Sequence, residues 1–149
     1  ANAIDDFQRR NPQLTTLWKT LMREYKKSVR SDFVMKLPSG RAVTYGKVDG
    51  SDWSYEKVLG KESSRRRAWH GLLIENCSQS IARDCLADAI VRVDKLGIIQ
   101  HFSVHDSIVC SVKDKEQAEE VAKVMRVSPE WAPGLPLDVD YKLTERYTK

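Results

Sequence analysis

The fold is decided by residues 97–112, GIIQHFSVHDSIVCSV, where the hydrophobic pattern changes its period. Apolar residues alternate with polar ones on both sides of His105-Asp106-Ser107. Alternation with a period of two is typical of strands, and two such runs around a short polar stretch indicate a β-hairpin. We therefore predict antiparallel strands over 98–104 and 108–112, with the His-Asp-Ser stretch at the tip.

A long helix is expected immediately before this hairpin. Residues 69–96 contain no proline and, after Gly71, no glycine, and Gly97 follows them. Glycine is favoured directly after a helix because it adopts the left-handed conformation there without steric cost. The sequence therefore predicts one helix over 69–96 that packs against the hairpin, which makes the fold class α+β.

Weaker patterns predict the remaining elements. Apolar residues at steps of three and four indicate a helix from Asn11, its N-cap, to about residue 30, with a short helix before it and another helix over 115–126. Two alternating runs around a Pro-Ser-Gly turn predict a hairpin over 33–45. The polar stretch 46–64 is expected to be a loop with a short strand near Trp53 and Tyr55, and 137–141 a final strand.

Composition indicates a globular chain. Its 149 residues are 41% hydrophobic and 31% charged, with no apolar run of about 18 residues and no secretory leader at the start. The formal charge of +4 mildly favours a polyanionic partner, although many basic proteins bind no nucleic acid. Cys77, Cys85 and Cys110 form no Cys-x-x-Cys pair and lie among apolar residues. We therefore expect buried, reduced thiols in a cytoplasmic protein that crosses no membrane.

Asp106 is the first candidate for chemistry. At the tip of a rigid hairpin, a carboxylate is exposed, ionised and available to a divalent cation. Aspartate is also common in turns for purely conformational reasons, so this position alone leaves a structural role open. His70 and His101 have no metal-ligand spacing to each other or to a cysteine, and we interpret both as structural.

Polar residues on the predicted long helix form the second candidate. Asn76, Gln79 and Arg83 lie at steps of three and four and so share a helix face. Amide and guanidinium groups suit base edges and phosphates, but an ordinary solvated face has the same pattern. The run 65–67, RRR, precedes the helix and is open to the same two interpretations, phosphate contact or simple solvation.

Several motifs, taken in order, resemble those of one family. Residues 104–109, VHDSIV, resemble motif C of family A DNA polymerases, usually Val-His-Asp-Glu. Residues 75–84, ENCSQSIARD, resemble the helix that precedes motif C in the phage-type members. The stretches 37–41, LPSGR, and 129–137, PEWAPGLPL, are similar to a hairpin and a tail of the same subfamily, and the end 147–149, YTK, fits its usual Tyr-x-Lys.

The resemblance implies roles for individual residues. Asp106 matches the aspartate that binds two catalytic Mg²⁺ ions, and His105 matches the histidine beside the primer 3′ terminus. Gln79 matches a glutamine that contacts the DNA minor groove, and Asn76 and Arg83 are carried as possible DNA neighbours. The implied fold is a partial polymerase palm, with fingers elements over residues 1–64 and the C-terminal palm portion over residues 65–149.

Two departures from the family pattern matter. Ser107 stands where glutamate is usual, although His-Asp-Ser also occurs in the related single-subunit RNA polymerases. The 149 residues contain neither a motif A aspartate segment nor a motif B helix, both of which would lie upstream. Since one aspartate cannot hold two metal ions about 3.5–4 Å apart, the chain alone is expected to be inactive.

Three functions therefore remain in competition. The first is a C-terminal portion or split subunit of a DNA-directed DNA polymerase in phage replication, with primer-template DNA, dNTPs and an upstream chain carrying motifs A and B as partners. The second is a catalytically inactive DNA-binding or assembly remnant of a polymerase. The third is part of a single-subunit RNA polymerase. The isolated chain is also expected to self-associate or to bind the missing half of the polymerase, through an unpaired strand edge beside Phe102, Val104 and Ile108.

Overall fold

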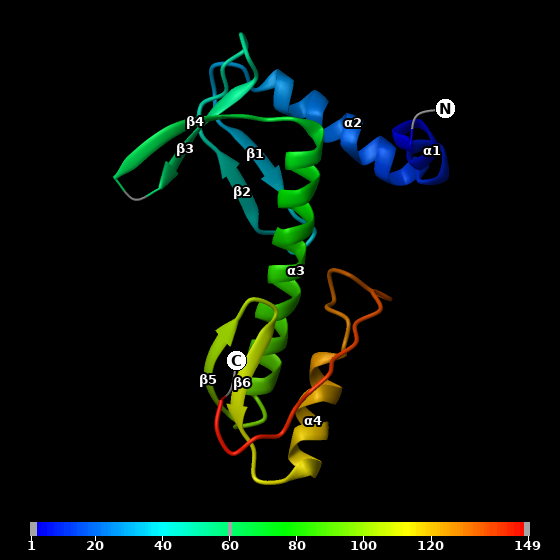
Figure 1. Ribbon diagram of the computed structural model, residues 1–149, viewed down its shortest axis with the longest axis vertical. Helices are drawn as coiled ribbons and strands as arrows, with labels where there is room; N and C mark the ends of the chain where they lie inside the picture. Colours follow the sequence, from blue (N-terminus) through cyan, green and yellow to red (C-terminus); the bar gives the residue numbers. More distant parts are fainter. Residues whose placement is uncertain (1–2, 60, 148–149) are drawn as a thin grey trace. The chain divides into compact units, whose positions relative to one another are not determined.

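The computed structural model describes residues 3–59 and 61–147, and its elements confirm the α+β class (Figure 1). Its strands pair as three separate antiparallel two-stranded sheets, β1–β2, β3–β4 and β5–β6. Among the described residues, no helix is both long and apolar enough to cross a membrane. The elements in chain order are α1 (Ala3–Arg10), α2 (Pro12–Lys27), β1 (Phe33–Lys36), β2 (Ala42–Tyr45), β3 (Ser54–Leu59), β4 (Glu62–Arg67), α3 (His70–Asp94), β5 (Ile99–Val104), β6 (Ser107–Ser111) and α4 (Lys115–Met125).

The chain divides into two compact units, Ala1–Ser80 and Ile81–Lys149. The division falls inside α3, so that helix contributes its first half to one unit and its second half to the other. The expected boundary between fingers and palm, after residue 64, is a functional assignment and stays a prediction. Of the expected C-terminal motif, Tyr147 is described, whereas Thr148 and Lys149 lie outside the described residues.

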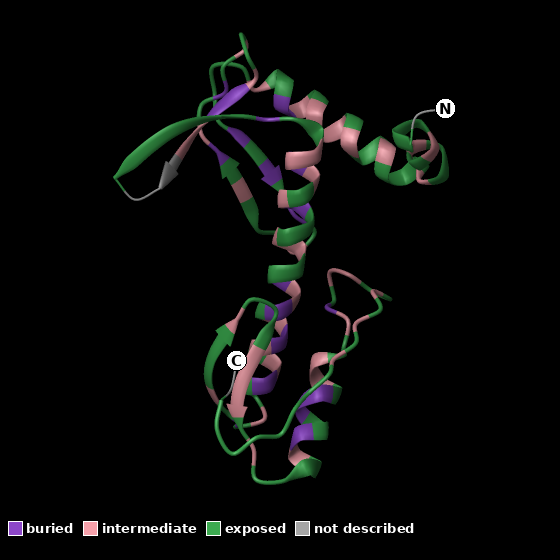
Figure 2. Ribbon diagram, in the orientation of Figure 1, coloured by how far each residue is buried: buried purple, intermediate pink, exposed green. Residues whose placement is uncertain are grey.

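The core of the first unit is a cluster of aromatic rings. Figure 2 shows buried positions on the strands of this unit. Tyr25 of α2 meets the rings of Phe33 and Tyr45 edge-on, with centroids 5.3 and 6.4 Å away, and Tyr45 meets Tyr55 at 5.0 Å. All four residues are buried. Edge-to-face pairs at these separations are a favourable arrangement of aromatic quadrupoles. The cluster therefore ties α2 to the β1–β2 and β3–β4 hairpins.

Within 46–64, the short strand expected near Trp53 and Tyr55 is present as β3, but the prediction of a loop was wrong beyond it, because β4 begins at Glu62. β3 and β4 pair over six positions, from Ser54↔Arg67 to Leu59↔Glu62. Every described side chain of β4 is exposed, so the strand lacks the alternation by which strands are recognised in a sequence. Gly46 fits beside this hairpin because a Cβ there would lie 2.3 Å from the Glu56 carbonyl oxygen.

Two smaller predictions also need correction. Asn11 begins α2, but its side chain makes no cap hydrogen bond and instead donates from Nδ2 to the Phe7 carbonyl of α1, 2.9 Å away. Residues 137–141 form no strand. Arg126 donates to Asp138 Oδ1 and to the Val139 carbonyl, at 3.0 and 2.5 Å. Side-chain hydrogen bonds of this kind give polar groups of the segment a partner without the backbone hydrogen bonds of a paired strand.

The second unit contains the predicted β5–β6 hairpin and α4, both packed on the second half of α3 (Figure 1). Its core is formed by Val93, Ile98 and Val121, with Ile108 and Cys110 against them. α3 ends at Asp94, and Gly97 lies in the turn that follows with a φ of +70°, close to the expected helix stop. The three cysteines are free, but only Cys77 is fully buried, since Cys85 and Cys110 are half-buried. Burial raises the pKa of each thiol, which keeps them protonated.

Candidate metal and nucleic-acid site

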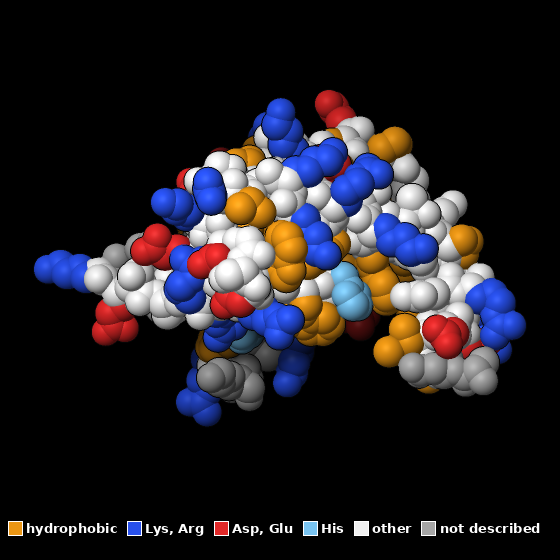
Figure 3. Space-filling view, turned by 90° about the horizontal axis from the view of Figure 1, so that it is seen from above, with side chains coloured by type: hydrophobic (Ala, Val, Ile, Leu, Met, Phe, Trp, Pro, Cys, Tyr) orange, Lys and Arg blue, Asp and Glu red, His pale blue; other side chains and the backbone are white. Residues whose placement is uncertain are grey.

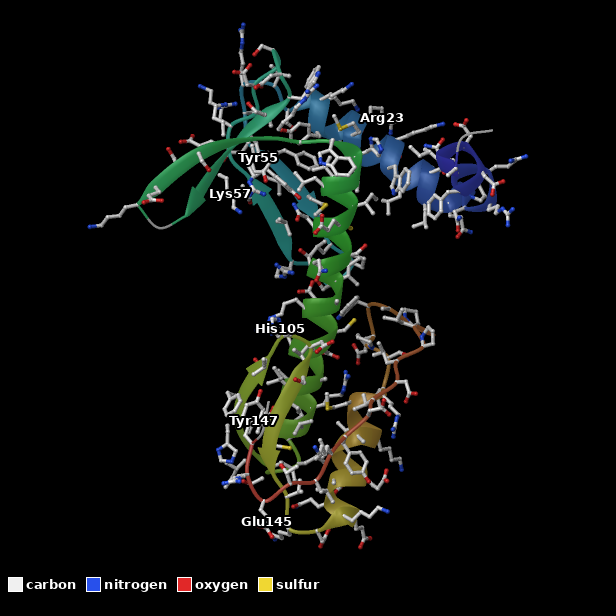
Figure 4. All side chains as sticks on the ribbon, viewed as in Figure 1. Arg23, Tyr55, Lys57, His105, Glu145 and Tyr147 are labelled. Carbon is white, nitrogen blue, oxygen red and sulfur yellow. The ribbon has the colours of Figure 1, made fainter. Side chains whose placement is uncertain are left out.

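The β5–β6 hairpin presents His105 and Asp106 in a two-residue turn. Figure 4 labels His105 at this turn. Val104 pairs with Ser107, so Ser107 belongs to strand β6. The prediction that Ser107 lies in the turn was wrong. Its Oγ donates to the Val104 carbonyl across the turn at 2.9 Å, which engages the hydroxyl locally. His105 and Asp106 are exposed, as predicted for a hairpin tip.

His105 has a backbone φ of +53°, in the left-handed region that most side chains avoid. Histidine tolerates this region better than β-branched residues, but glycine or asparagine would adopt it at lower cost. A strained residue that persists at an exposed tip invites a functional explanation. The left-handed backbone of His105 therefore forms the turn that joins β5 to β6 and places Asp106 at its tip.

Asp106 offers one carboxylate to a metal ion. Within residues 3–59 and 61–147, no group of three or more His, Cys, Asp or Glu side chains could hold a metal. Magnesium in phosphoryl-transfer sites is held by one or two carboxylates, with water and substrate phosphates completing the shell. A single exposed carboxylate thus fits one part of such a site and requires a further carboxylate from elsewhere.

The polar residues of α3 differ in their surroundings. In the first unit, Asn76 is half-buried and donates from Nδ2 to the Tyr45 hydroxyl, 2.9 Å away, whereas Gln79 is exposed. Burial raises the pKa of Tyr45, and the hydrogen bond from Asn76 partly opposes that rise. In the second unit, Arg83 is exposed. Gln79 and Arg83 are therefore open to a ligand, while the Asn76 amide is engaged with the core.

The arginine run, Arg65 to Arg67, lies on β4 of the hairpin that the sequence did not predict. Arg65 donates from Nε to Ser54 Oγ at 2.9 Å and from Nη2 to the Ser54 carbonyl at 3.1 Å, so it braces the hairpin. Its neighbours Arg66 and Arg67 are exposed. Trp69, which follows, is 55% exposed and was missed as a candidate. The only signal in the sequence was an aromatic residue next to a basic run.

Comparison with known proteins gives one informative match. No family model matches the chain, and no solved structure matches it. The protein named DNA polymerase from Bacillus phage SP02 is 34% identical to it over 128 residues, an alignment that covers 77% of this chain and 19% of that relative. The chain is a distant homologue of a phage DNA polymerase. This confirms the resemblance at that level, and membership of family A stays a prediction.

Proposed function

We propose that the chain is the C-terminal part, or a split subunit, of a family A DNA-directed DNA polymerase. The alignment spans only 19% of the phage relative's length, so the proposed activity belongs to a larger polymerase. The cytoplasm of a bacterial host is the location that we propose for that polymerase. The observation that carries the proposal is the exposed Asp106 in a two-residue turn at the end of a hairpin. The sequence around this turn also resembles the metal-binding motif of that family.

The geometry of the turn suits the proposed role. Template-directed synthesis needs a carboxylate that holds the metal ion beside the reacting phosphate and does not move when substrates bind. The hairpin is anchored by Ile108 and Cys110 in the core of the second unit, so its tip has a rigid base. The Ser107–Val104 hydrogen bond closes the turn and fixes the direction of the preceding residue pair.

In the proposed mechanism, Asp106 would hold Mg²⁺ together with carboxylates supplied by an upstream part of the polymerase. The bound metal would supply Lewis acidity toward the primer 3′ hydroxyl and the triphosphate. His105 would contact the primer terminus beside Asp106. Gln79 and Arg83, both exposed, would contact the primer-template duplex, one at the minor groove and the other at phosphates.

Primer extension tests this proposal. The purified chain alone should incorporate no nucleotide, because it brings one of the carboxylates that two metal ions require. Addition of an upstream polymerase portion that carries motifs A and B should restore synthesis. Asp106→Ala should then abolish it, whereas Asp140→Ala, which removes another exposed carboxylate of the same unit, should leave it intact. Synthesis that survives Asp106→Ala rules out the proposed role.

The second candidate is a DNA-binding remnant without catalysis. Ser107 favours it, because the hydroxyl is engaged with the Val104 carbonyl and adds no charge where a second acidic side chain would strengthen metal binding. The same assay distinguishes the two. A remnant would bind primer-template DNA and the upstream portion, yet the mixture would stay inactive with wild-type Asp106.

A further inference from the structure

Helix α2 of the first unit has two sides of different chemistry. At 3.6 residues per turn, its basic residues fall within an arc of about 100°, and its apolar residues fall on the opposite side of the helix. The basic residues are Lys19, Arg23, Lys26 and Lys27, and the apolar ones are Leu14, Leu17, Trp18, Leu21, Met22 and Tyr25. Tyr25 is fully buried, so the apolar side packs inward and the basic side faces solvent.

The basic side chains of α2 are exposed and only partly engaged by the protein. Lys19 makes no hydrogen bond or ion pair within residues 3–59 and 61–147. Arg23, labelled in Figure 4, donates from Nε to Glu24 Oε1 at 3.2 Å, and Lys27 Nζ donates to the same oxygen at 2.9 Å. Glu24 thus restrains two of the cations, while the terminal guanidinium nitrogens of Arg23 have no acceptor in the described part of the chain.

Lys26 is positioned by an aromatic ring. Its Nζ lies 4.9 Å from the centroid of the Trp53 ring, which is a cation–π contact. The Tyr25 hydroxyl donates to the Trp53 carbonyl at 3.1 Å and so ties that residue to the helix. At this end of the basic side, α2 therefore presents a fixed positive charge over the indole.

The positive charge of the chain is concentrated in the unit that contains α2. Residues 1–80 contain 15 Lys and Arg against 9 Asp and Glu, a formal charge of +6, whereas residues 81–149 contain 10 against 12, a charge of −2. With four cations and one carboxylate, α2 alone carries +3 of that charge. Figure 3 shows several Lys and Arg side chains close together on the face seen from above. Lys and Arg that cluster along one helix are the electrostatic footprint of nucleic-acid binding.

We infer that Lys19, Arg23, Lys26 and Lys27 bind the phosphates of duplex DNA, at a surface other than the Asp106 turn. The choice of DNA as the polyanion rests on the proposed function. Contacts from cations to phosphates carry no base information, so the surface binds any sequence. A duplex has more closely spaced charges than a single strand and binds more tightly. A basic amphipathic helix also suits an anionic membrane, but here Tyr25 and the Phe7–Trp18 stack, with centroids 5.6 Å apart, occupy much of the apolar side.

Fluorescence anisotropy of the 149-residue chain with a labelled duplex of about 20 base pairs, from about 50 to 200 mM salt, tests the inference. Lys19→Gln/Arg23→Gln should lower the slope of log affinity against log salt by about 1.8, since each phosphate contact on a duplex contributes about 0.9. Glutamine matches lysine and arginine in helix propensity, so α2 is retained. Lys19→Arg/Arg23→Lys keeps both charges and should keep the slope. The matched control Lys36→Gln/Lys47→Gln removes two exposed charges of the same unit outside α2 and should also leave the slope unchanged.

Several results would overturn the inference. The first three are the absence of duplex binding by the wild-type chain, an unchanged slope in Lys19→Gln/Arg23→Gln, and an equal loss of slope in the Lys36/Lys47 control. Tighter binding of oligo(dT) of the same length would assign the surface to a single strand. Tighter binding of phosphatidylserine vesicles, lost in Lys19→Gln/Arg23→Gln, would assign it to a membrane. Asp106→Ala should leave the slope unchanged, so this inference and the proposed catalytic role fail independently.

Discussion

Replacement of Asn76 by alanine should destabilise the first unit, because the Asn76 amide supports the aromatic core. Its Nδ2 donates to the Tyr45 hydroxyl at 2.9 Å, and Tyr45 is 3% exposed. Asn76→Ala removes the donor that this buried hydroxyl has in the structure. A buried polar group left without a partner costs about 1–3 kcal/mol, and we expect Asn76→Ala to lower the free energy of unfolding by this amount.

A double-mutant cycle with Tyr45→Phe isolates the hydrogen bond. In Tyr45→Phe the half-buried Asn76 amide still reaches water, so the loss should be smaller, about 1 kcal/mol. With both groups removed, no polar atom of the pair is left without its partner. The loss of unfolding free energy in the double variant should therefore be about 1 kcal/mol smaller than the sum of the losses in the two single variants.

Urea denaturation followed by fluorescence measures these free energies. Gln79→Ala, an exposed position on the same helix, is the control and should change stability by less than about 0.5 kcal/mol. If Asn76→Ala is as stable as wild type and the coupling energy is zero, the hydrogen bond has no structural role. Loss of primer-template affinity with unchanged stability would then favour Asn76 as a DNA contact.

Three further outcomes are expected. Burial raises the pKa of Tyr25 to about 12, so the neutral phenol contributes stability below pH 10 that is lost as the pH rises towards 12. Tyr25→Phe should flatten this pH dependence, measured by urea denaturation from about pH 9 to 12. Asp114 caps α4 because its Oδ1 accepts from the backbone N–H of Gln117 at 2.8 Å. Asp114→Ala should therefore lower the free energy of unfolding by about 0.5–2 kcal/mol and lower the melting temperature, and an unchanged melting temperature would refute the cap. Ser107→Glu should lower the Mg²⁺ concentration needed for half-maximal synthesis in the complemented enzyme, because it adds a second carboxylate beside Asp106. The control Ser103→Glu, on the partner strand β5, should leave that Mg²⁺ concentration unchanged.

Elements with strong periodicity were predictable from the sequence. The long helix, the β5–β6 hairpin and α4 each combine a clear apolar period with a stop signal such as Gly97, and the structure confirms them within about two residues. The β3–β4 hairpin was missed because β4 buries none of its side chains. The strand expected over 137–141 was wrong because Arg126 binds that segment through Asp138 and Val139, a contact that local sequence cannot reveal.

The candidate site was predictable to a similar extent. The exposure of Asp106 followed from its place between two alternating runs, and the structure places it in the turn. The engagement of Asn76 with Tyr45 joins residues 31 positions apart, so helical spacing alone could not separate it from the exposed Gln79. The position of Trp69 depends on the space left by Gly71. This dependence is visible in the structure of the helix start but not in the sequence.

The most direct test of the central claim is the rate of a single nucleotide incorporation. A chimera of the SP02 polymerase, in which this chain replaces the homologous segment, would be compared with its Asp106→Asn and Asp140→Asn variants under single-turnover conditions. Loss of a metal-binding carboxylate removes several kcal/mol of transition-state stabilisation, so Asp106→Asn should slow incorporation by about 10³-fold or more. Asp140→Asn should match the parent chimera. Equal rates for all three would contradict the assignment of Asp106 as the catalytic carboxylate.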